Sequence, residues 1–140
     1  MTTADLTRKT KIPLDNLWPL LSDFTGSPSP AFPVVVHEKG DPGNNGVGAI
    51  RTLTIGKITV MERLEAVTPS RSFTYRILSG SPVKRYLGKW EFREEKAYTL
   101  VQWRADFKPK FPLTGWIIAM VTRRVIHRII DQIEADNMAG

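Results

Sequence analysis

The sequence predicts an α+β domain in which a strongly curved antiparallel sheet wraps around one long C-terminal helix. An amphipathic pattern spans residues 113–135, and short alternating segments typical of strands fill residues 34–109. Tight-turn residues join these segments into hairpins. All 140 residues are expected to form one domain with its own core, and the space between sheet and helix is the expected functional site.

The N-terminal part is expected to supply a strand over residues 4–12, a helix over residues 16–24 and a loop over residues 26–30. Pro19 would fall in the first helical turn, where its missing N–H is tolerated. The apolar residues of this helix share one face: Leu17, Leu20, Leu21 and Phe24.

Residues 34–36 begin a second strand, which ends at a loop rich in Gly, Pro and Asn over residues 40–48. Residues 40–46 join strands and do not open a helix, so they do not match a phosphate-binding loop. We interpret them as a flexible loop at the mouth of the cavity.

The hairpin of residues 47–55 and 58–67 is the most informative local feature. Its two-residue loop, Gly56-Lys57, suits a type II′ turn. Side chains alternate along strands, so this turn predicts an apolar core face that carries an opposed Arg and Glu. Counting from the turn gives the pairs on that face: Ala49 with Leu64, Arg51 with Glu62, Leu53 with Val60, and Ile55 with Ile58.

Three further strands are expected over residues 72–78, 84–93 and 98–108. The first would place Phe73, Tyr75 and Ile77 on one side. A two-residue loop between the other two strands would set Trp90 opposite Val101, Gly88 opposite Trp103, and Tyr86 opposite Ala105. A Gly opposite a large Trp lets the sheet bend while the ring covers bare backbone.

The C-terminal helix is expected to present a broad apolar face to the sheet, and its polar face carries His127 four residues before Asp131, an exposed i,i+4 pair. Its basic positions, Arg123, Arg124 and Arg128, can touch anionic lipid during ligand transfer, although nothing in the sequence requires this. The apolar face consists of Ile118, Val121, Thr122, Val125, Ile126, Ile129, Ile130 and Ile133.

Composition and charge exclude several function classes. With no Cys and two isolated His outside any ligand spacing, neither a metal nor a cofactor is expected. The net charge is +6, but Lys and Arg are spread along the chain, so we expect a solvated basic surface and no nucleic-acid partner. We find no signal peptide, and the apolar run 116–121 is too short for stable membrane insertion, so a cytoplasmic protein is expected.

Several segments together carry a resemblance to a known family: IP at 12–13, LWPLLSDF at 17–24, GVGAIRTL at 46–53, MERL at 61–64, FTYRI at 73–77 and WRADFKP at 103–109. In order and spacing, over nearly the whole chain, they resemble the START/Bet v 1-like (SRPBCC) superfamily, in its bacterial polyketide cyclase/dehydrase-type branch. The resemblance implies a helix-grip fold with a deep internal cavity, lined by Arg51, Leu53, Glu62, Tyr86 and Gly88. It does not define the function, because this scaffold hosts carriers, receptors and enzymes. One departure is that residues 25–33 lack the Trp often found there.

Arg51 and Glu62 are the sharpest candidate pair, because a charge on a core-facing strand is costly unless it is paired or hydrated. They are either a polar anchor in the cavity wall or a structural ion pair. The inward aromatic side chains are likewise either core or cavity wall.

The leading hypothesis is binding, with transport or sensing as its purpose, of a small hydrophobic, ring-containing or lipid-like molecule by a monomer or homodimer. The predicted binding residues are Arg51, Leu53, Val60, Glu62, Phe73, Tyr75, Tyr86, Gly88, Trp90, Trp103, Ile118, Val121, Val125 and Ile129.

The rival hypothesis is a cofactor-independent enzyme similar to a polyketide aromatase/cyclase, catalysing aldol closure and dehydration. Arg51 and Tyr86 would polarise a carbonyl, and Glu62 would be the base if burial raised its affinity for a proton. A third alternative is a stress or regulatory module whose loops contact a protein partner when the cavity is occupied.

Overall fold

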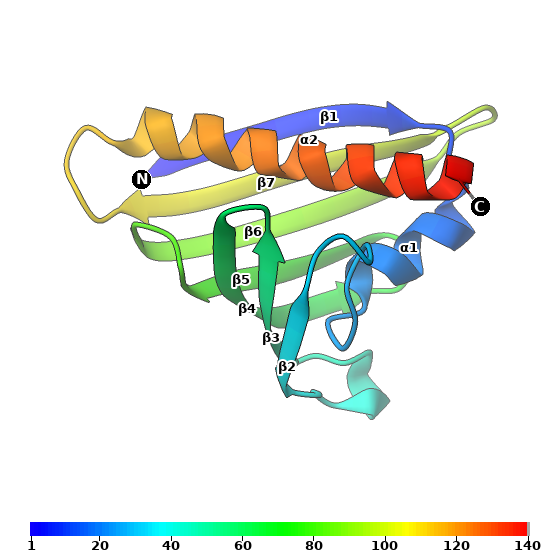
Figure 1. Cartoon of the computed structure of the whole chain (residues 1–140), viewed down its shortest axis with the longest axis horizontal. Helices are drawn as coiled ribbons and strands as arrows, with labels where there is room; N and C mark the ends of the chain where they lie inside the picture. Colours follow the sequence, from blue (N-terminus) through cyan, green and yellow to red (C-terminus); the bar gives the residue numbers. More distant parts are fainter. Residues whose placement is uncertain (140) are drawn as a thin grey trace.

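Seven antiparallel strands form one sheet, and a long helix lies across its face. In the computed structural model, which describes residues 1–139, α2 runs along β1 and β7 while the sheet curves away beneath it toward β2 (Figure 1). The strands lie in the order β1-β7-β6-β5-β4-β3-β2. The predicted α+β fold is confirmed, and its elements are β1 (Thr2–Thr10), α1 (Leu14–Ser22), β2 (Val34–Glu38), the 3₁₀ helix η1 (Pro42–Asn44), β3 (Ile50–Ile55), β4 (Ile58–Thr68), β5 (Ser72–Ser79), β6 (Val83–Glu94), β7 (Thr99–Pro109) and α2 (Gly115–Ala139).

The β3–β4 hairpin has the predicted register, with Arg51 opposite Glu62. Of the two turn residues only Gly56 has a positive φ, 61°, as a type II′ turn requires. Farther along, β4 shifts its register against β5 twice, next to Glu62 and next to Leu64. Such bulges bend a strand and increase its twist, so they contribute to the curvature that makes room for α2.

The predicted register of the β6–β7 hairpin is wrong by two residues. Trp90 lies opposite Trp103, and Gly88 lies opposite Ala105. The chain reverses over residues 95–98, where the Glu95 N–H donates to the Tyr98 carbonyl, 2.9 Å away. A shift by an even number leaves every side chain on its predicted face, because side chains alternate along a strand.

Both helices begin at other residues than predicted. Helix α1 starts two residues early, at Leu14, so Pro19 lies in its interior and not in its first turn. Its Leu20 is exposed, contrary to the predicted apolar face. Helix α2 starts at Gly115 and continues past residue 135 to Ala139.

The polar face of α2 is bonded to β1 through Arg8. The Arg8 guanidinium lies 2.5 Å from Asp131 Oδ1 and 2.6 Å from Glu134 Oε1, and it donates to the His127 carbonyl at 3.1 Å. Arg8 therefore takes the place of the predicted His127–Asp131 pair, which forms no hydrogen bond within residues 1–139. Thr10 adds a hydrogen bond to Glu134 Oε2, 2.9 Å long.

The core lies between the concave face of the sheet and the two helices. Trp103, Phe107 and Leu64 of the sheet are fully buried, as are Leu17 of α1 and Ile130 of α2. None of the helices described in residues 1–139 is long and apolar enough to span a membrane.

Candidate functional site

A cavity of about 270 Å³ lies between the concave face of the sheet and α2. All of the predicted binding residues except Gly88 and Trp103 line it. Val121 does so at the rim, because its side chain is 39% exposed and not buried as the helical pattern predicted. The predicted loop at the mouth is a wrong interpretation, because no residue of 40–48 lines the cavity. Residues 42–44 form η1, which lies beyond the end of β2 and away from α2 (Figure 1).

Further wall residues come from parts of the chain that the sequence did not single out for the site. Leu21, Phe24 and Pro28 belong to α1 and the segment after it, and residues 80–82 belong to the β5–β6 loop. Strand alternation places Ile55, Ile58 and Ile77 on the core face, and the helical pattern places Thr122 and Ile126 there, but none of them was predicted to bind a ligand. Ile117, which is outside the predicted apolar face of the helix, also lines the cavity.

Gly88 and Trp103 do not line the cavity, but both contact Tyr75, which does. A Cβ at Gly88 would lie 2.4 Å from the Tyr75 ring, so this position must lack a side chain for the ring to lie flat on β6. Trp103 Nε1 donates to the Tyr75 hydroxyl at 3.0 Å. The ring that covers the bare backbone of Gly88 is thus that of Tyr75, and not Trp103 as predicted.

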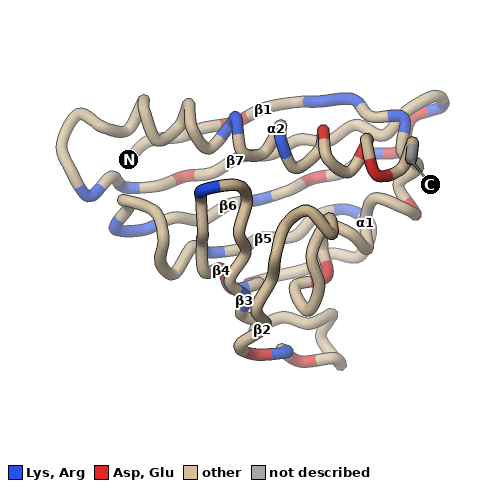
Figure 2. The backbone as a smooth tube through the Cα atoms, in the orientation of Figure 1, with Lys and Arg blue, Asp and Glu red and all other residues tan. Residues whose placement is uncertain are grey.

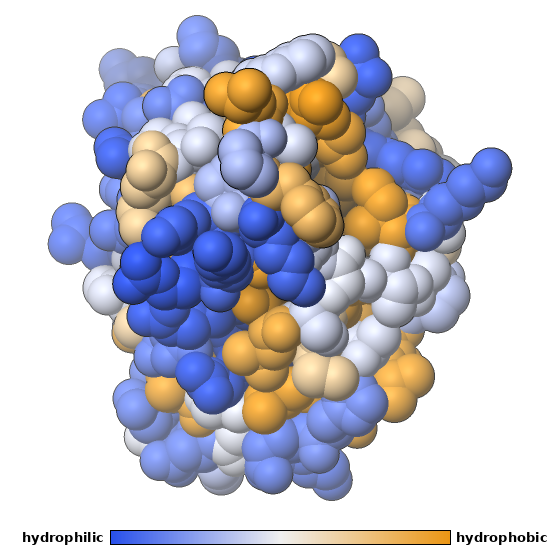
Figure 3. Space-filling view, turned by 90° about the vertical axis from the view of Figure 1, so that its left-hand side faces the viewer, coloured by the Kyte–Doolittle hydropathy of each residue, from blue (hydrophilic) through white to orange (hydrophobic). Residues whose placement is uncertain are grey.

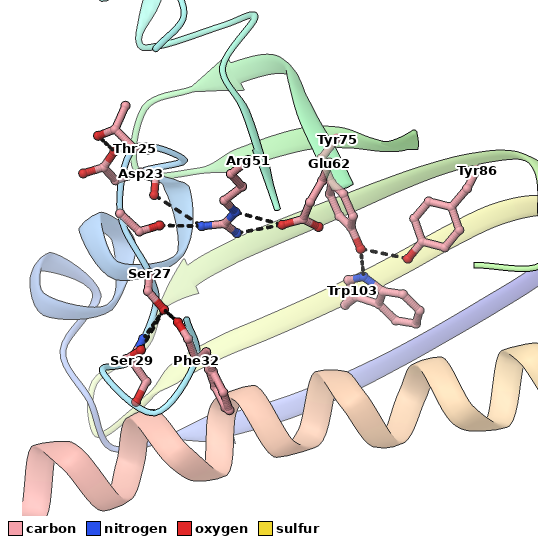
Figure 4. Close-up of polar contacts among 11 residues, drawn as sticks. Asp23, Thr25, Ser27, Ser29, Phe32, Arg51, Glu62, Tyr75, Tyr86 and Trp103 are labelled. Atoms are coloured by element: carbon pink, nitrogen blue, oxygen red, sulfur yellow. Dashed lines mark hydrogen bonds and ion pairs between the residues drawn. The ribbon is translucent and has the colours of Figure 1, made fainter. Parts of the chain in front are cut away.

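Arg51 and Glu62 form a buried ion pair on neighbouring strands. Arg51 Nε lies 2.9 Å and its terminal nitrogen 2.8 Å from the same oxygen, Glu62 Oε1 (Figure 4). The other terminal nitrogen donates to the Gly26 carbonyl at 2.8 Å, and the Phe24 ring packs against the guanidinium at 4.1 Å. Arg51 therefore joins the hairpin to the segment after α1 and fixes the position of Glu62.

The second carboxylate oxygen, Glu62 Oε2, is the free acceptor of the site. It takes part in no hydrogen bond in the described part of the chain (Figure 4), where every fully buried polar side-chain atom has a partner. Oε2 must therefore reach open space, and the open space beside Glu62 is the cavity. A carboxylate oxygen at an apolar wall is a strong acceptor for a ligand hydroxyl or a bound water.

Tyr75 and Tyr86 form a hydrogen-bonded phenol pair, with their hydroxyl oxygens 2.8 Å apart. Burial raises the pKa of both phenols, and the charge of Glu62 raises that of Tyr75 further, so both are neutral at physiological pH. The two phenols carry two hydroxyl protons, and one of these forms the hydrogen bond between their oxygens. The hydrogen bond from Trp103 to Tyr75 uses the indole N–H proton and therefore no phenol proton. One phenol proton remains available for a ligand.

Besides Arg51, Ser81 and Thr122, the mainly apolar wall thus offers one free carboxylate oxygen as an acceptor and one phenol proton as a donor. Such a combination orients a compact apolar molecule that carries a carbonyl or hydroxyl group. Within residues 1–139, no three His, Asp or Glu side chains come together as a metal site would require. His37 is exposed on β2 and bonds Thr52, with Nε2 and Oγ1 2.7 Å apart, away from the cavity.

A curved antiparallel sheet around a C-terminal helix, with a cavity between them, defines the helix-grip fold. The chain belongs to the family described as polyketide cyclase / dehydrase and lipid transport, whose model matches residues 1–140. The predicted START/Bet v 1-like superfamily is thereby confirmed.

Solved structures share this fold. The protein XoxI from Bacillus cereus is 20% identical with a TM-score of 0.75, over 97% of this chain and 95% of its own. A START superfamily protein from Mycobacterium smegmatis is 12% identical with a TM-score of 0.75, over 97% of each chain. Ara h 8.0201 is 17% identical with a TM-score of 0.73, over 99% of this chain and 98% of its own. No curated protein matches the sequence.

Proposed function

We propose that the protein binds a small hydrophobic, ring-containing or lipid-like molecule in the cavity between the sheet and α2. The observation that supports this most is an apolar cavity of about 270 Å³ with Glu62 Oε2 and the Tyr75–Tyr86 pair in its wall. A filled core would have no such space, since protein interiors are close-packed.

The cavity volume favours a compact ligand. A dry apolar cavity of about 150 Å³ holds benzene, and drug-sized ligands occupy roughly 300–1,000 Å³. A volume of about 270 Å³ therefore suits one or two rings better than a sterol or a long acyl chain. The polar groups favour ligands that carry a hydroxyl or carbonyl group.

An amide-NMR titration tests this proposal, with a panel of hydroxylated one- and two-ring aromatics, flavonoids, aromatic polyketides, fatty acids and sterols. We expect saturable shifts around Arg51, Glu62, Tyr86 and the middle of α2 for the compact aromatics. Silence across the whole panel would contradict the proposal.

A matched pair of variants controls the titration. Val121→Trp fills the rim of the cavity and is expected to abolish the shifts, whereas Leu87→Trp is not. Val121 and Leu87 are equally exposed, at 39% and 38%, but Leu87 does not line the cavity.

A second candidate function, aldol cyclisation and dehydration of a poly-β-keto chain, is favoured by the free Glu62 oxygen beside an available phenol proton. A carboxylate base takes a proton from the carbon next to a carbonyl, and a phenol donor stabilises the enolate oxygen. Arg51, whose donors are directed at Glu62 and the Gly26 carbonyl, would position the base and not touch the substrate.

Turnover of a poly-β-keto mimic separates the two functions. If the protein is a cyclase, Glu62→Gln abolishes turnover while the mimic still binds, and Glu65→Gln, at the other face of β4, leaves turnover unchanged. Binding by the wild-type protein with no turnover would eliminate the enzyme and leave the binding proposal intact.

A further inference from the structure

Three large apolar side chains are exposed together where β7 leads into α2. Phe111, Leu113 and Trp116, which we call the β7–α2 patch, are 60%, 92% and 66% exposed. All three border one open hollow of the surface. The connection that carries Phe111 and Leu113 projects at the left-hand end of the molecule in Figure 1. Contiguous exposed apolar surface of this kind marks an interaction site.

The backbone holds the tip of this patch in an unusual conformation. Leu113 has a positive φ, 64°, which residues other than Gly, Asn and Asp rarely adopt. The side chain gains no burial from this conformation. Strain of this kind, at a residue that contacts little within the molecule, points to a role outside it.

The charged side chains that border the hollow are all lysines. Lys84, Lys108 and Lys110 border the same hollow and form no salt bridge within residues 1–139. From residue 107 to residue 130 the chain has no Asp or Glu, but it has Lys108, Lys110, Arg123, Arg124 and Arg128. Figure 2 shows only Lys and Arg on the connection at this end. In Figure 3 hydrophobic and strongly hydrophilic groups border on each other there.

The patch adjoins the mouth of the cavity. Ile117 follows Trp116 directly on α2, is 41% exposed and lines the cavity wall. A surface that rested on the patch would therefore lie next to the opening between α2 and the β5–β6 loop.

We propose that the β7–α2 patch docks the protein on the surface of an anionic lipid bilayer. Exposed Phe and Leu side chains insert at the boundary of headgroups and acyl chains, Trp favours that boundary, and Lys side chains are attracted to anionic headgroups. A symmetric dimer through the same patch would set its lysines against their own copies, which the charge disfavours. Docking does not depend on whether the cavity holds a ligand.

Vesicle binding by the full chain tests the charge part of the proposal. We expect binding to phosphatidylcholine vesicles with about 30% phosphatidylserine, and little binding to phosphatidylcholine alone. Because each surface cation contributes roughly a five-fold factor, Lys108→Gln/Lys110→Gln should weaken binding about 25-fold. The control Lys39→Gln/Lys96→Gln removes two exposed lysines elsewhere and should change nothing. Equal effects of both double variants would overturn the assignment of the patch.

The apolar part has its own readout. Brominated lipids should quench the fluorescence of Trp116, the most exposed Trp of the chain. Phe111→Asn/Leu113→Asn should abolish binding and quenching, and Asn keeps the positive φ at residue 113 accessible. The control Leu20→Asn, on the exposed surface of α1, should abolish neither vesicle binding nor quenching. The proposal is overturned by absence of vesicle binding at low salt, or by a dimer in sedimentation that Leu113→Asn dissolves.

Discussion

Two arginines on the sheet form ion pairs with carboxylates, Arg8 with two and Arg51 with one, and the two clusters differ in burial. Arg8 on β1 joins Asp131 and Glu134 of α2, with side chains that are 18%, 66% and 33% exposed. Arg51 on β3 joins Glu62 of β4 with both side chains almost fully buried, at 5% and 8%. The Arg8 cluster ties the helix to the edge of the sheet. The Arg51 pair lies in the cavity wall and leaves one carboxylate oxygen free. Both clusters contain ion pairs, so burial is what distinguishes the pair at the candidate site from the Arg8 cluster, which only attaches α2 to the sheet.

The largest expected effect is on stability. Arg51→Met leaves Glu62 buried without a partner and should lower the free energy of unfolding by about 3–5 kcal/mol. Arg8→Met loses bonds to partly hydrated carboxylates and should cost about 1–2 kcal/mol. Urea denaturation measures both. Equal losses would contradict the distinction between the two clusters.

Replacing the whole buried pair sharpens the comparison. Arg51→Met/Glu62→Leu removes both charges, and such replacements are often neutral or stabilising, so stability should return to within about 1 kcal/mol of wild type. The amide shifts caused by hydroxylated ligands should still be lost, because the acceptor is gone. A stable double variant that binds these ligands normally would show the pair to be structural only.

The phenol pair predicts how stability depends on high pH. The folded-state pKa values of Tyr75 and Tyr86 are raised above the ordinary value of 10.0, so the unfolded chain loses these protons first. Their contribution is full below pH 10 and declines above it, by about 1.4 kcal/mol per pH unit for each phenol. Tyr75→Phe/Tyr86→Phe should flatten this decline in denaturation measured from pH 9 upward. An unchanged decline would assign it to other groups.

The smallest expected effect is that salt changes the stabilising contributions of the two arginine clusters to different extents. Added salt of about 0.5 M screens the exposed Arg8 cluster but hardly the buried pair. We expect the Arg8→Met variant to lose a few tenths of a kcal/mol less than wild type on salt addition. The Arg51→Met variant should respond to salt as wild type does, and thermal denaturation can compare all three.

The sequence predicted those parts of the site that a tight turn determines. Gly56 fixes the β3–β4 turn, and counting from it gives the Arg51–Glu62 pair that the structure contains. The β6–β7 register was missed because residues 95–98 include no Gly or Asn to mark the turn. That the wall residues bind a ligand stays a prediction.

The remaining differences come from tertiary packing that local patterns do not contain. A helical wheel places Val121 on the apolar face, but it cannot show that the cavity opens there. Neither could the pattern reveal that Arg8, from the far end of the chain, would reach Asp131. The β7–α2 patch was not predicted either, because Phe111 precedes Pro112 outside any periodic segment, and the amphipathic pattern of residues 113–135 does not show that Leu113 lies before the helix begins.

The placement of β1 between β7 and the polar face of α2 also bears on how the chain folds. Thr3 and Asp106, bonded across these strands at 2.6 Å, are 103 residues apart in sequence. The hairpins from β3 to β7 join strands that are close in sequence, whereas β1 pairs with β7 and contacts α2, which are distant in sequence. High contact order of this kind slows folding. No residue of β1 lines the cavity, but Arg8 of β1 holds α2, so the helical wall of the cavity is expected to become fixed late, when the first strand pairs with the last elements of the chain.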